Sequence, residues 1–392
     1  MYKTYKVMLL PNNKQNTKLF ACAGVSRFAY NWTLDFQQTN HNNGNKFVND
    51  IDLRRIFTQL KKEPAYQWLS VYSNNITKQA IKDACNAYKR FFSKKSEFPK
   101  FKSKKKSKPS FFVDPEKISF TNGHVKLEKL TTSKKANKQK FNLVKLAEKN
   151  RIPINSKYAN PHVTFDGLHW WLSVSVEETV ITNNNPSPKA EGIGIDLGIK
   201  DLAICSDGNT YKNINKSKAI KKLKKKHRRL QRQLSRKYEQ NKQNGKSVKT
   251  HNIEKQRIKL LKVTKRLQSI RHNYINQMTT EIMKRNPSFI VLEDLNVKGM
   301  MKNRHLAKAI QEQCFYEVYR QLEYKSKWLE TTLITANRWY PSSKLCSKCG
   351  YIHKDLKLKV REYVCPQCNN HIDRDFQAAY NLYTYGIKHL AS

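Results

Sequence analysis

Four cysteines constrain the C-terminal part of this chain more tightly than any other feature. They fall within 23 residues as two Cys-x-x-Cys pairs, Cys346 with Cys349 and Cys365 with Cys368. Two such pairs at this spacing are typical of a tetrahedral zinc site with four thiolate ligands. Because the protein would fill all four positions, we expect one structural Zn²⁺ ion. Asn369 and Asn370 follow the second pair, where glycine is common, and asparagine also tolerates a positive φ.

The remaining cysteines and the apolar runs bear on the compartment. We expect the other four cysteines to be small buried side chains: Cys22, Cys85, Cys205 and Cys314. Thiols used for a metal rather than for disulfides indicate a reducing environment. No apolar run approaches the roughly 18 residues of a membrane span, and Pro11 ends the short apolar run near the N-terminus. We therefore expect a cytoplasmic protein with no membrane partner.

The charge of the chain indicates the kind of partner. Lys and Arg number 76 against 30 Asp and Glu, which gives a net charge of +46. Nucleic acid suits such a surface because binding releases condensed counterions. Residues 216–271 hold 22 Lys or Arg against Glu239 and Glu254, and residues 94–108 hold eight Lys against Glu97. A charge run is usually a solvated helix face, but this density favours a surface that follows phosphates.

The N-terminal half is predicted as a β module interrupted by a small helical domain. Residues 1–10 predict a strand, which we expect to pair with a region of strand character over 111–180. The clearest signal there is VTFDGLHWWLSVSVEE, a hairpin that turns at Asp166-Gly167. Apolar spacing predicts helices over 15–38, 50–62 and 75–93.

Aromatic residues in this half allow two readings. The stretch FPKFKSKKKSKPSFF interleaves lysines with four phenylalanines, Phe98, Phe101, Phe111 and Phe112. Bases stack on aromatic rings while lysines neutralise phosphate, so the stretch suits a single-stranded nucleic acid. A flexible linker whose phenylalanines anchor in the core is an equally good interpretation. Trp170 and Trp171 are expected in the core of the β module.

The C-terminal half is predicted to alternate strands and helices after a polar linker over 181–192. GIGIDLG and LAICSDG predict two strands in close succession, and FIVLEDL and TTLITAN predict two more. Leucine and isoleucine spacing predicts a basic helical hairpin over 216–236 and 253–285, joined by a polar loop over 237–252. Further helices are expected over 306–330 and 374–388.

Three acidic positions stand at the ends of these elements. Asp196 lies in the middle of an apolar strand, where a carboxylate is costly unless it is paired or binds a cation. Glu293 ends another apolar strand, and its neighbour Asp294 must face the opposite way. Asp375 lies in the turn that opens the last helix. Carboxylates that converge from separate elements can hold two Mg²⁺ ions, which activate water for phosphodiester hydrolysis.

Each acid also has an ordinary structural interpretation. Asp196 could be a turn residue, Glu293 and Asp294 could be strand-end charges, and either Asp373 or Asp375 could cap the last helix. Each interpretation is reasonable alone. Together, on a chain of charge +46, they explain less than a shared site does.

The sequence resembles a known family, TnpB, over nearly its whole length. The resemblance is carried by IGIDLGIKDLAICSDG, VLEDLNVKGMMKNRHLAKAI, LEYKSKW, YPSSKLCSKCG and REYVCPQCNNHIDRDFQAAYNL, in that order. KQNTKLFACAGVSRFAYNWTL and AYKRFFSKKSEFPKFKSK match more loosely. TnpB proteins are RNA-guided DNA endonucleases of bacterial insertion sequences, similar to type V CRISPR effectors.

The resemblance implies a multidomain α+β protein. Residues 190–392 would form a RuvC-like nuclease domain of the RNase H fold, with a mixed α/β sheet. The basic hairpin, 216–285, and a zinc ribbon, 343–371, would be inserted in it. Residues 1–10 and 111–182 would form a β wedge module, interrupted by a helical recognition domain over 11–110.

The resemblance also implies a site and partners. Asp196, Glu293 and Asp375 match the family's catalytic carboxylates, which would bind two Mg²⁺ or Mn²⁺ ions. The partners would be an omega-type guide RNA from the transposon end and double-stranded target DNA with a short adjacent motif, which would bring the protein to the nucleoid. Guide–target pairing would select the sequence. Candidate nucleic-acid contacts are Gln79, Lys100, Lys102, Lys225, Arg228, Arg229 and Arg232.

Three positions depart from the family pattern. Gln377 stands where asparagine is usual, and Asn273 and Asn276 stand where the family tends to have Asp and His. None of them removes a carboxylate ligand. Two other functions remain open: an RNA-guided repressor that has lost cleavage, and a DNA transposase of the same fold.

Overall fold

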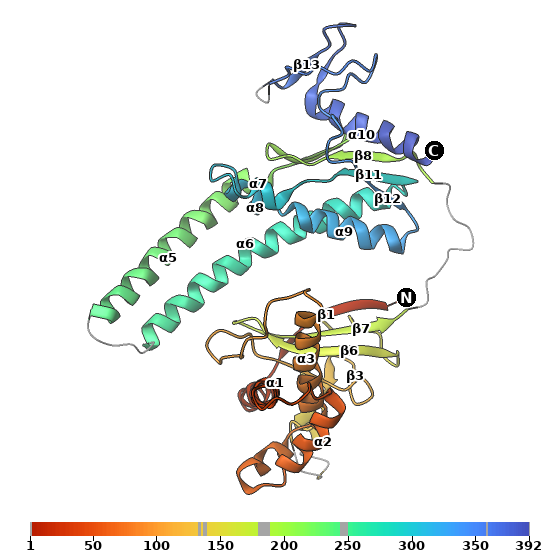
Figure 1. The fold of residues 1–392 in the computed structure, drawn as a ribbon. Helices are drawn as coiled ribbons and strands as arrows, with labels where there is room; N and C mark the ends of the chain where they lie inside the picture. The colour runs from red at the N-terminus through yellow and green to blue at the C-terminus, as the bar shows by residue number, and fades with distance from the viewer. Residues whose placement is uncertain are drawn as a thin grey trace. The chain divides into compact units, whose positions relative to one another are not determined.

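The computed structural model describes residues 2–131, 135, 139–178, 189–243, 250–357 and 360–391. It divides into unit 1, Met1–Val180, and unit 2, Ile181–Ser392 (Figure 1). The predicted linker over 181–192 lies mostly outside the described residues, as does part of the predicted loop over 237–252. No helix in the described ranges has both the length and the apolar character that crossing a membrane requires.

Unit 1 is built on an antiparallel sheet in the order β2-β6-β7-β1-β5-β4-β3. The predicted pairing of the first strand with the later strand region is confirmed, because β1 pairs with both β5 and β7. The predicted hairpin is confirmed as well, with Gly167 in its turn at a φ of 97°. The strands are β1 Tyr2–Leu10, β2 Ser110–Phe112, β3 Ser119–Thr121, β4 His124–Lys126, β5 Leu143–Leu146, β6 Tyr158–Phe165 and β7 Trp170–Glu177.

The helices of unit 1 share one hydrophobic core with this sheet. They are α1 Asn13–Asn42, α2 Asp50–Leu60, the 3₁₀ helix Pro64–Val71 and α3 Asn74–Phe92. Asn12 and Gln15 form a capping box that starts α1. The Gln15 side chain also donates to the carbonyls of Phe141 and Leu143 and thereby fastens α1 to β5. Trp170 is buried in the core, whereas Trp171 on the other face is half-buried and donates to Asp166.

Unit 2 is built on a mixed sheet in the order β10-β9-β8-β11-β12. The strands are β8 Ile193–Asp196, β9 Asp201–Cys205, β10 Thr210–Lys212, β11 Phe289–Glu293 and β12 Thr332–Ala336. β8, β11 and β12 are parallel, whereas β9 and β10 are antiparallel to their neighbours. The parallel strands therefore end at a common edge.

Helices cover both faces of this sheet (Figure 1). Ile290 and Leu292 pack with α6 and α9 on one face, and Phe289 and Val291 pack with α10 on the other. α10 spans Arg374–Ala391 and α9 spans Phe315–Trp328. α10 crosses β8 so closely that a Cβ on Gly194 would lie 2.1 Å from the Ala379 carbonyl oxygen. Only glycine permits this approach.

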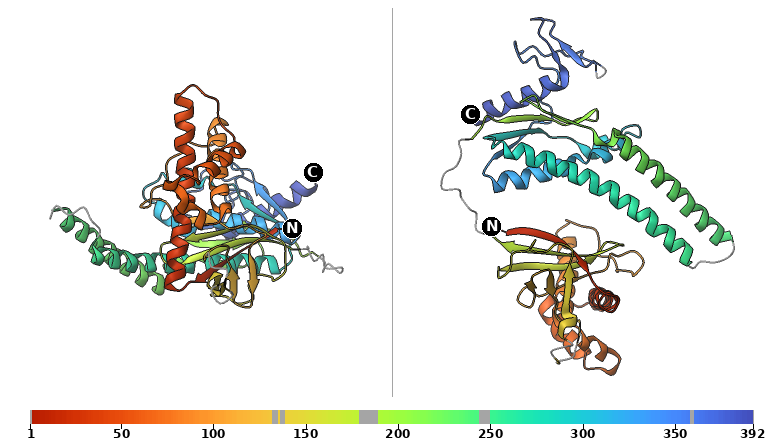
Figure 2. Two further views of the ribbon diagram at one scale, coloured as in Figure 1. Left: turned by 90° about the horizontal axis from the view of Figure 1, so that it is seen from below. Right: turned by 180° about the vertical axis from the view of Figure 1, so that it is seen from behind.

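The predicted helical hairpin is confirmed as α5, Lys218–Gln243, and α6, His251–Lys284, which lie side by side in both views of Figure 2. Its seam is apolar and contains Ile220, Leu230, Val263 and Leu267. The end of α6 carries Ile275 and Met278, which join the core of unit 2. The hairpin is therefore continuous with the sheet domain through α6.

Two predictions from the sequence were wrong in detail. Asp196 ends β8 rather than lying in mid-strand, because the chain leaves the sheet there to turn into β9. The helix over 306–330 is two helices, α8 Ala307–Gln313 and α9, which meet at Cys314 with a φ of 54°. Cys314 is consequently half-buried, whereas Cys22, Cys85 and Cys205 are buried as predicted.

Candidate metal centres

The three predicted acids gather at one edge of the unit 2 sheet. Ile195 pairs with Leu292 in the parallel register, so Asp196 and Glu293 leave adjacent strands side by side. Asp375 lies in the first turn of α10, the helix that packs on β8. Strand ends and a helix start thus bring together residues that are up to 179 positions apart.

The pKa of Asp196 reflects this clustering. Its pKa is raised well above the ordinary value, first by burial and then by the negative charges of Glu293 and Asp375. Burial also raises the pKa of Glu293, although the Ser342 hydroxyl, which donates to its carboxylate, opposes that shift. A group of acids that share a partly desolvated site is costly without a cation. The cluster therefore suits a divalent metal.

Asp375 is held by an arginine from the ribbon segment. Arg361 Nη1 lies 3.2 Å and 3.3 Å from the two carboxylate oxygens of Asp375. The structure gives helix capping to Asp373, whose Oδ1 accepts from the backbone N–H groups of Asp375 and Phe376 at 3.0 Å and 2.9 Å. The carboxylate of Asp375 is consequently spared that role.

The acids are close but are not drawn around one point. In the described part of the chain, the four cysteines are the group whose ligand atoms all lie within 4.8 Å of one another, and the carboxylates are spaced more widely. Asp294, the neighbour of Glu293, pairs with Arg338 at 2.5 Å. The oxygen donors fit Mg²⁺ or Mn²⁺, whose preferred ligands are carboxylates.

The cysteine cluster has the dimensions of a zinc site. Sγ of Cys346 lies 3.6 Å from Sγ of Cys368, and Sγ of Cys349 lies 3.5 Å from Sγ of Cys365. Four sulfurs about 2.3 Å from a central Zn²⁺ would be spaced by about 3.8 Å. The geometry therefore fits one zinc ion with four thiolate ligands.

The backbone of the ribbon explains the residues that follow each cysteine pair. Gly350 and Asn369 both adopt a positive φ, 78° and 51°. Their N–H groups donate to the carbonyls of Cys346 and Cys365, each at 3.0 Å. The prediction that asparagine replaces glycine at a left-handed position is confirmed at Asn369. β13 Glu362–Val364 and β14 His371–Asp373 pair beside the cluster and lead into α10.

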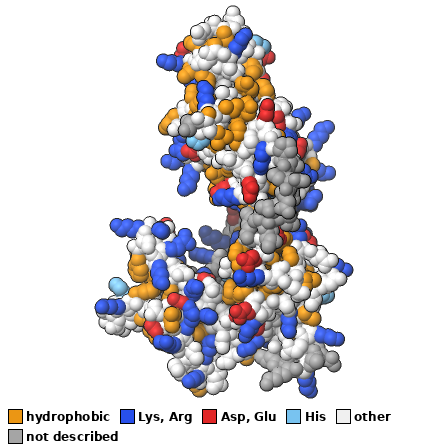
Figure 3. Space-filling model, turned by 90° about the vertical axis from the view of Figure 1, so that its right-hand side faces the viewer, with side chains coloured by type: hydrophobic (Ala, Val, Ile, Leu, Met, Phe, Trp, Pro, Cys, Tyr) orange, Lys and Arg blue, Asp and Glu red, His pale blue; other side chains and the backbone are white. Residues whose placement is uncertain are grey.

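The predicted nucleic-acid contacts lie in separate units. In unit 1, Gln79 donates to Asp83 at 2.8 Å, Lys100 pairs with Glu97 at 2.8 Å, and the Lys102 ammonium lies 3.6 Å from the centre of the Tyr30 ring. On α5 of unit 2, four basic side chains are exposed: Lys225, Arg228, Arg229 and Arg232. Figure 3 shows Lys and Arg scattered over one face of the molecule, with fewer acids among them.

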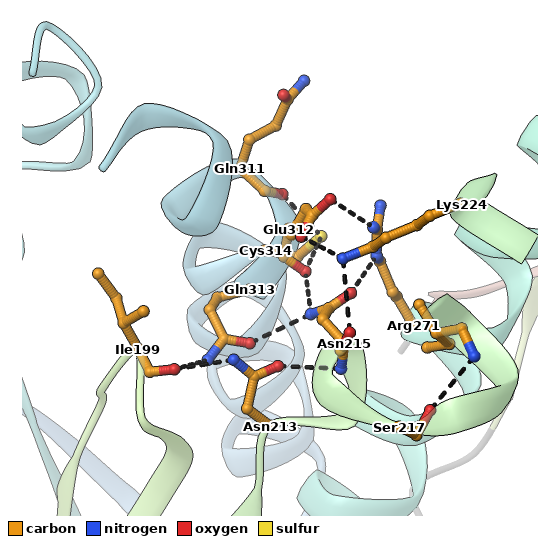
Figure 4. Close-up of polar contacts among 11 residues, drawn as sticks. Ile199, Asn213, Asn215, Ser217, Lys224, Arg271, Gln311, Glu312, Gln313 and Cys314 are labelled. Atoms are coloured by element: carbon orange, nitrogen blue, oxygen red, sulfur yellow. Dashed lines mark hydrogen bonds and ion pairs between the residues drawn. The ribbon is translucent and has the colours of Figure 1, made fainter. Parts of the chain in front are cut away.

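A polar network fixes the base of the basic hairpin (Figure 4). Glu312 of α8 accepts from Lys224 at 2.5 Å and lies 3.4 Å from Arg271. The Asn215 amide donates to the Glu312 carbonyl at 2.9 Å and accepts from Arg271 at 2.7 Å. Lys224 and Arg271 thus share the single negative charge of Glu312 and are engaged within the protein. The charge count of the hairpin overstates the cations that it offers to phosphate.

Sequence reasoning missed several residues around the acids. Ser342 and Arg361 lie within the stretches YPSSKLCSKCG and REYVCPQC, but nothing in their types or spacing marks them as partners of Glu293 and Asp375. Gln377 is fully buried, and neither atom of its amide has a hydrogen-bond partner among the described residues.

Comparisons with known proteins define the class that this chain resembles. A family model described as "Probable transposase" matches residues 172–304, a "Helix-turn-helix domain" model of the same insertion-sequence group matches 1–46, and a "Cas12f1-like, TNB domain" model matches 315–382. The chain is therefore similar to insertion-sequence proteins over 1–46 and 172–304 and to Cas12f1-like proteins near its C-terminus. These matches confirm the resemblance to TnpB.

Two curated relatives match almost the full chain. A "Putative RNA-guided DNA endonuclease" of Streptomyces pristinaespiralis is 29% identical over 98% of this chain and 89% of its own. "Putative RNA-guided DNA endonuclease InsQ" of Escherichia coli K12 is 29% identical over 99% of this chain and 93% of its own. Among solved structures, a mini-RNA-guided endonuclease, CRISPR-Cas_phi3, covers 98% of this chain and 92% of its own at 10% identity, with a TM-score of 0.44.

Proposed function

We propose that this protein is an RNA-guided DNA endonuclease that cleaves target DNA by metal-dependent phosphodiester hydrolysis. One observation carries the proposal: Asp196, Glu293 and Asp375, from three separate elements, gather at one sheet edge, where burial and then the charges of the other two acids raise the pKa of Asp196. The names of the curated relatives support the reaction class. The net charge of +46 supports nucleic-acid partners.

The three carboxylates have separate tasks in this proposal. Divalent ions held by them would activate a water molecule and stabilise the leaving oxygen of the cut strand. Asp196 and Glu293 are fixed by the paired strands, and Ser342 orients Glu293 by its hydrogen bond. Asp375 is presented by a helix whose cap is supplied by Asp373, so its carboxylate can exchange Arg361 for a metal.

The domain layout belongs to the same proposal. Residues 190–392 act as a RuvC-like nuclease domain of the RNase H fold, with the zinc ribbon, 343–371, inserted before Asp375. Residues 1–10 and 111–182 act as a wedge that, with a recognition domain over 11–110, holds an omega-type guide RNA and reads the adjacent motif. Gln79 faces that motif, and the exposed side of α5 follows the guide–target duplex. Both partners place the activity in the cytoplasm, at the nucleoid when DNA is bound.

The decisive experiment is to express the chain with its genomic flank and sequence the RNA that copurifies. We expect one RNA species of defined size whose end can be replaced by a chosen guide. The resulting complex should cut DNA that matches the guide in Mg²⁺ but not in EDTA. Guide-dependent binding to target DNA without cleavage in either Mg²⁺ or Mn²⁺ would identify a repressor. Strand transfer without any copurified RNA would identify a transposase.

A further inference from the structure

The two most exposed large hydrophobic side chains in the described residues belong to segments that line or flank a cavity at the acidic edge. Trp339 is 85% exposed and Tyr316 is 70% exposed. Trp339 follows β12 by three residues, and Tyr316 is the second residue of α9. Single exposed aromatic side chains are common on protein surfaces, so their exposure alone assigns no ligand. The cavity beside them, next to the acidic cluster, is the observation that suggests one.

A cavity of about 350 Å³ is lined by Tyr316 and by Arg338, the residue that precedes Trp339. It lies where β11 and β12 end and α9 begins, and Tyr316, Tyr319, Leu197 and Arg338 line it together with Glu293. Its volume falls in the usual range of small-ligand pockets, roughly 300–1,000 Å³. One wall thus belongs to the proposed catalytic centre.

The chemistry of the cavity favours a neutral ring over a phosphate. Its residues Asp294 and Arg338 already pair with each other at 2.5 Å, and its other charged residues are Glu293 and Lys298. Aromatic and aliphatic side chains form much of the remaining wall. The two carboxylates and two cations of the lining balance, so a phosphate group gains no net attraction there, whereas a nucleobase offers an uncharged face that stacks on an aromatic side chain.

The segment that carries Trp339 is fastened to the same edge. Arg338 pairs with Asp294, and Ser342 donates to Glu293. The Asn337 side chain accepts from the backbone N–H of Trp339 at 2.9 Å, and the Tyr340 hydroxyl donates to the Asn381 carbonyl at 3.1 Å. These contacts hold the backbone around an exposed indole, which lowers the entropy lost when a base stacks on it.

We propose that Tyr316 and Trp339 form a base-stacking subsite that positions the single DNA strand being cut beside the acidic cluster. The subsite binds bases without choosing among them, because every base has a π-face. Selection of the sequence is left to the guide RNA. This inference rests on the proposed function and assigns the occupant of the cavity as a nucleobase of the substrate strand.

The test uses the full chain with its guide RNA and target DNA in which single abasic nucleotides are placed in turn around the cut site. We expect Trp339→Ala and Tyr316→Ala each to slow cleavage about 5- to 100-fold, which is the usual range for loss of one stacked base. Trp339→Phe should keep most of the activity. Leu329→Ala, an exposed residue at the opposite end of α9, is the matched control.

The abasic substrates separate stacking from a structural role. An abasic nucleotide at one position should slow the wild-type protein, yet slow Trp339→Ala no further, because both changes remove the same contact. If the losses from the abasic nucleotide and from Trp339→Ala add up, or if both alanine variants keep full activity, the stacking subsite is contradicted. Neither outcome would contradict the proposed nuclease activity. A shift in oligomeric state with unchanged cleavage would show that a second copy covers the patch. A wild-type complex that cuts no DNA would remove the proposed function and this inference with it.

Discussion

The two candidate metal centres of unit 2 differ in how their ligands are held. The cysteines come from one short segment, and their sulfurs already stand at distances that suit zinc. The carboxylates come from β8, β11 and α10, lie farther apart, and are engaged by Ser342 and Arg361. The first centre is closed and suits a structural ion. The second is open, with ligands that can still rearrange around substrate and metal.

Removal of one carboxylate should give the largest effect. We expect Asp196→Ala to lower cleavage by about a thousandfold or more, because the ligand set acts as a unit. Binding of RNA and target DNA should stay nearly unchanged, since Asp196 lies at the acidic edge and not on the basic helix α5. Cleavage and filter binding on the same preparations measure both. The control is Asp207→Ala, which removes an acid of unit 2 that pairs with Arg285. Equal cleavage by Asp196→Ala and wild type would remove this centre from the mechanism.

The cysteine centre should instead respond in stability. We expect Cys349→Ser to lose the single zinc ion and to lower the melting temperature of the C-terminal region, because metal binding supplies folding free energy there. Zinc content by mass spectrometry and thermal melting measure the two effects. Cys314→Ser changes a cysteine of unit 2 outside the cluster and should retain zinc. Unchanged zinc and melting in Cys349→Ser would contradict a four-thiolate site.

A smaller change should reveal competition at the open centre. Arg361 pairs with Asp375, so we expect Arg361→Ala to lower the Mg²⁺ concentration for half-maximal cleavage by about two- to fivefold, the range of an exposed ion pair. A titration of cleavage rate against Mg²⁺ measures it. Arg320→Ala, which breaks an ion pair with Glu317, should leave the titration unchanged. A higher Mg²⁺ requirement would mean that Arg361 positions Asp375 instead.

A buried lysine in the same unit offers a comparison with the buried acids, because its charge has the opposite sign. Lys325 donates to Thr279 and Thr280 at 2.7 Å and 2.8 Å, and burial lowers its pKa to about 8. Because the unfolded chain binds its proton up to a higher pH, this group adds stability as pH rises from about 8 to 10. We expect Lys325→Met to remove that contribution. Denaturant titrations across this pH range measure the unfolding free energy of both proteins. If the variant is the more stable protein at pH 8, its advantage over wild type should shrink as pH rises. A constant difference would contradict the shift.

Much of the fold could be predicted because apolar periodicity reports local structure. β1, α1 and the helical hairpin follow from alternation or three-to-four spacing, and β11 follows from an uninterrupted apolar run. The break at Cys314 could not, because the residue type does not demand a positive φ and the surrounding contacts impose it. The sequence also could not show that Lys224 and Arg271 are paired within the protein, since their partner Glu312 comes from a distant helix.

The sequence by itself determined which residues can bind metal: a zinc motif is local, so spacing alone specifies its four ligands. It also marked Asp196, Glu293 and Asp375 as acids within or at the ends of predicted elements, although it placed Asp196 in mid-strand. Only the tertiary structure decided that parallel pairing and the packing of α10 on Gly194 bring these acids to one edge. It alone placed Tyr316 in a cavity shared with Glu293. Convergence of distant segments depends on packing, and no local pattern encodes it.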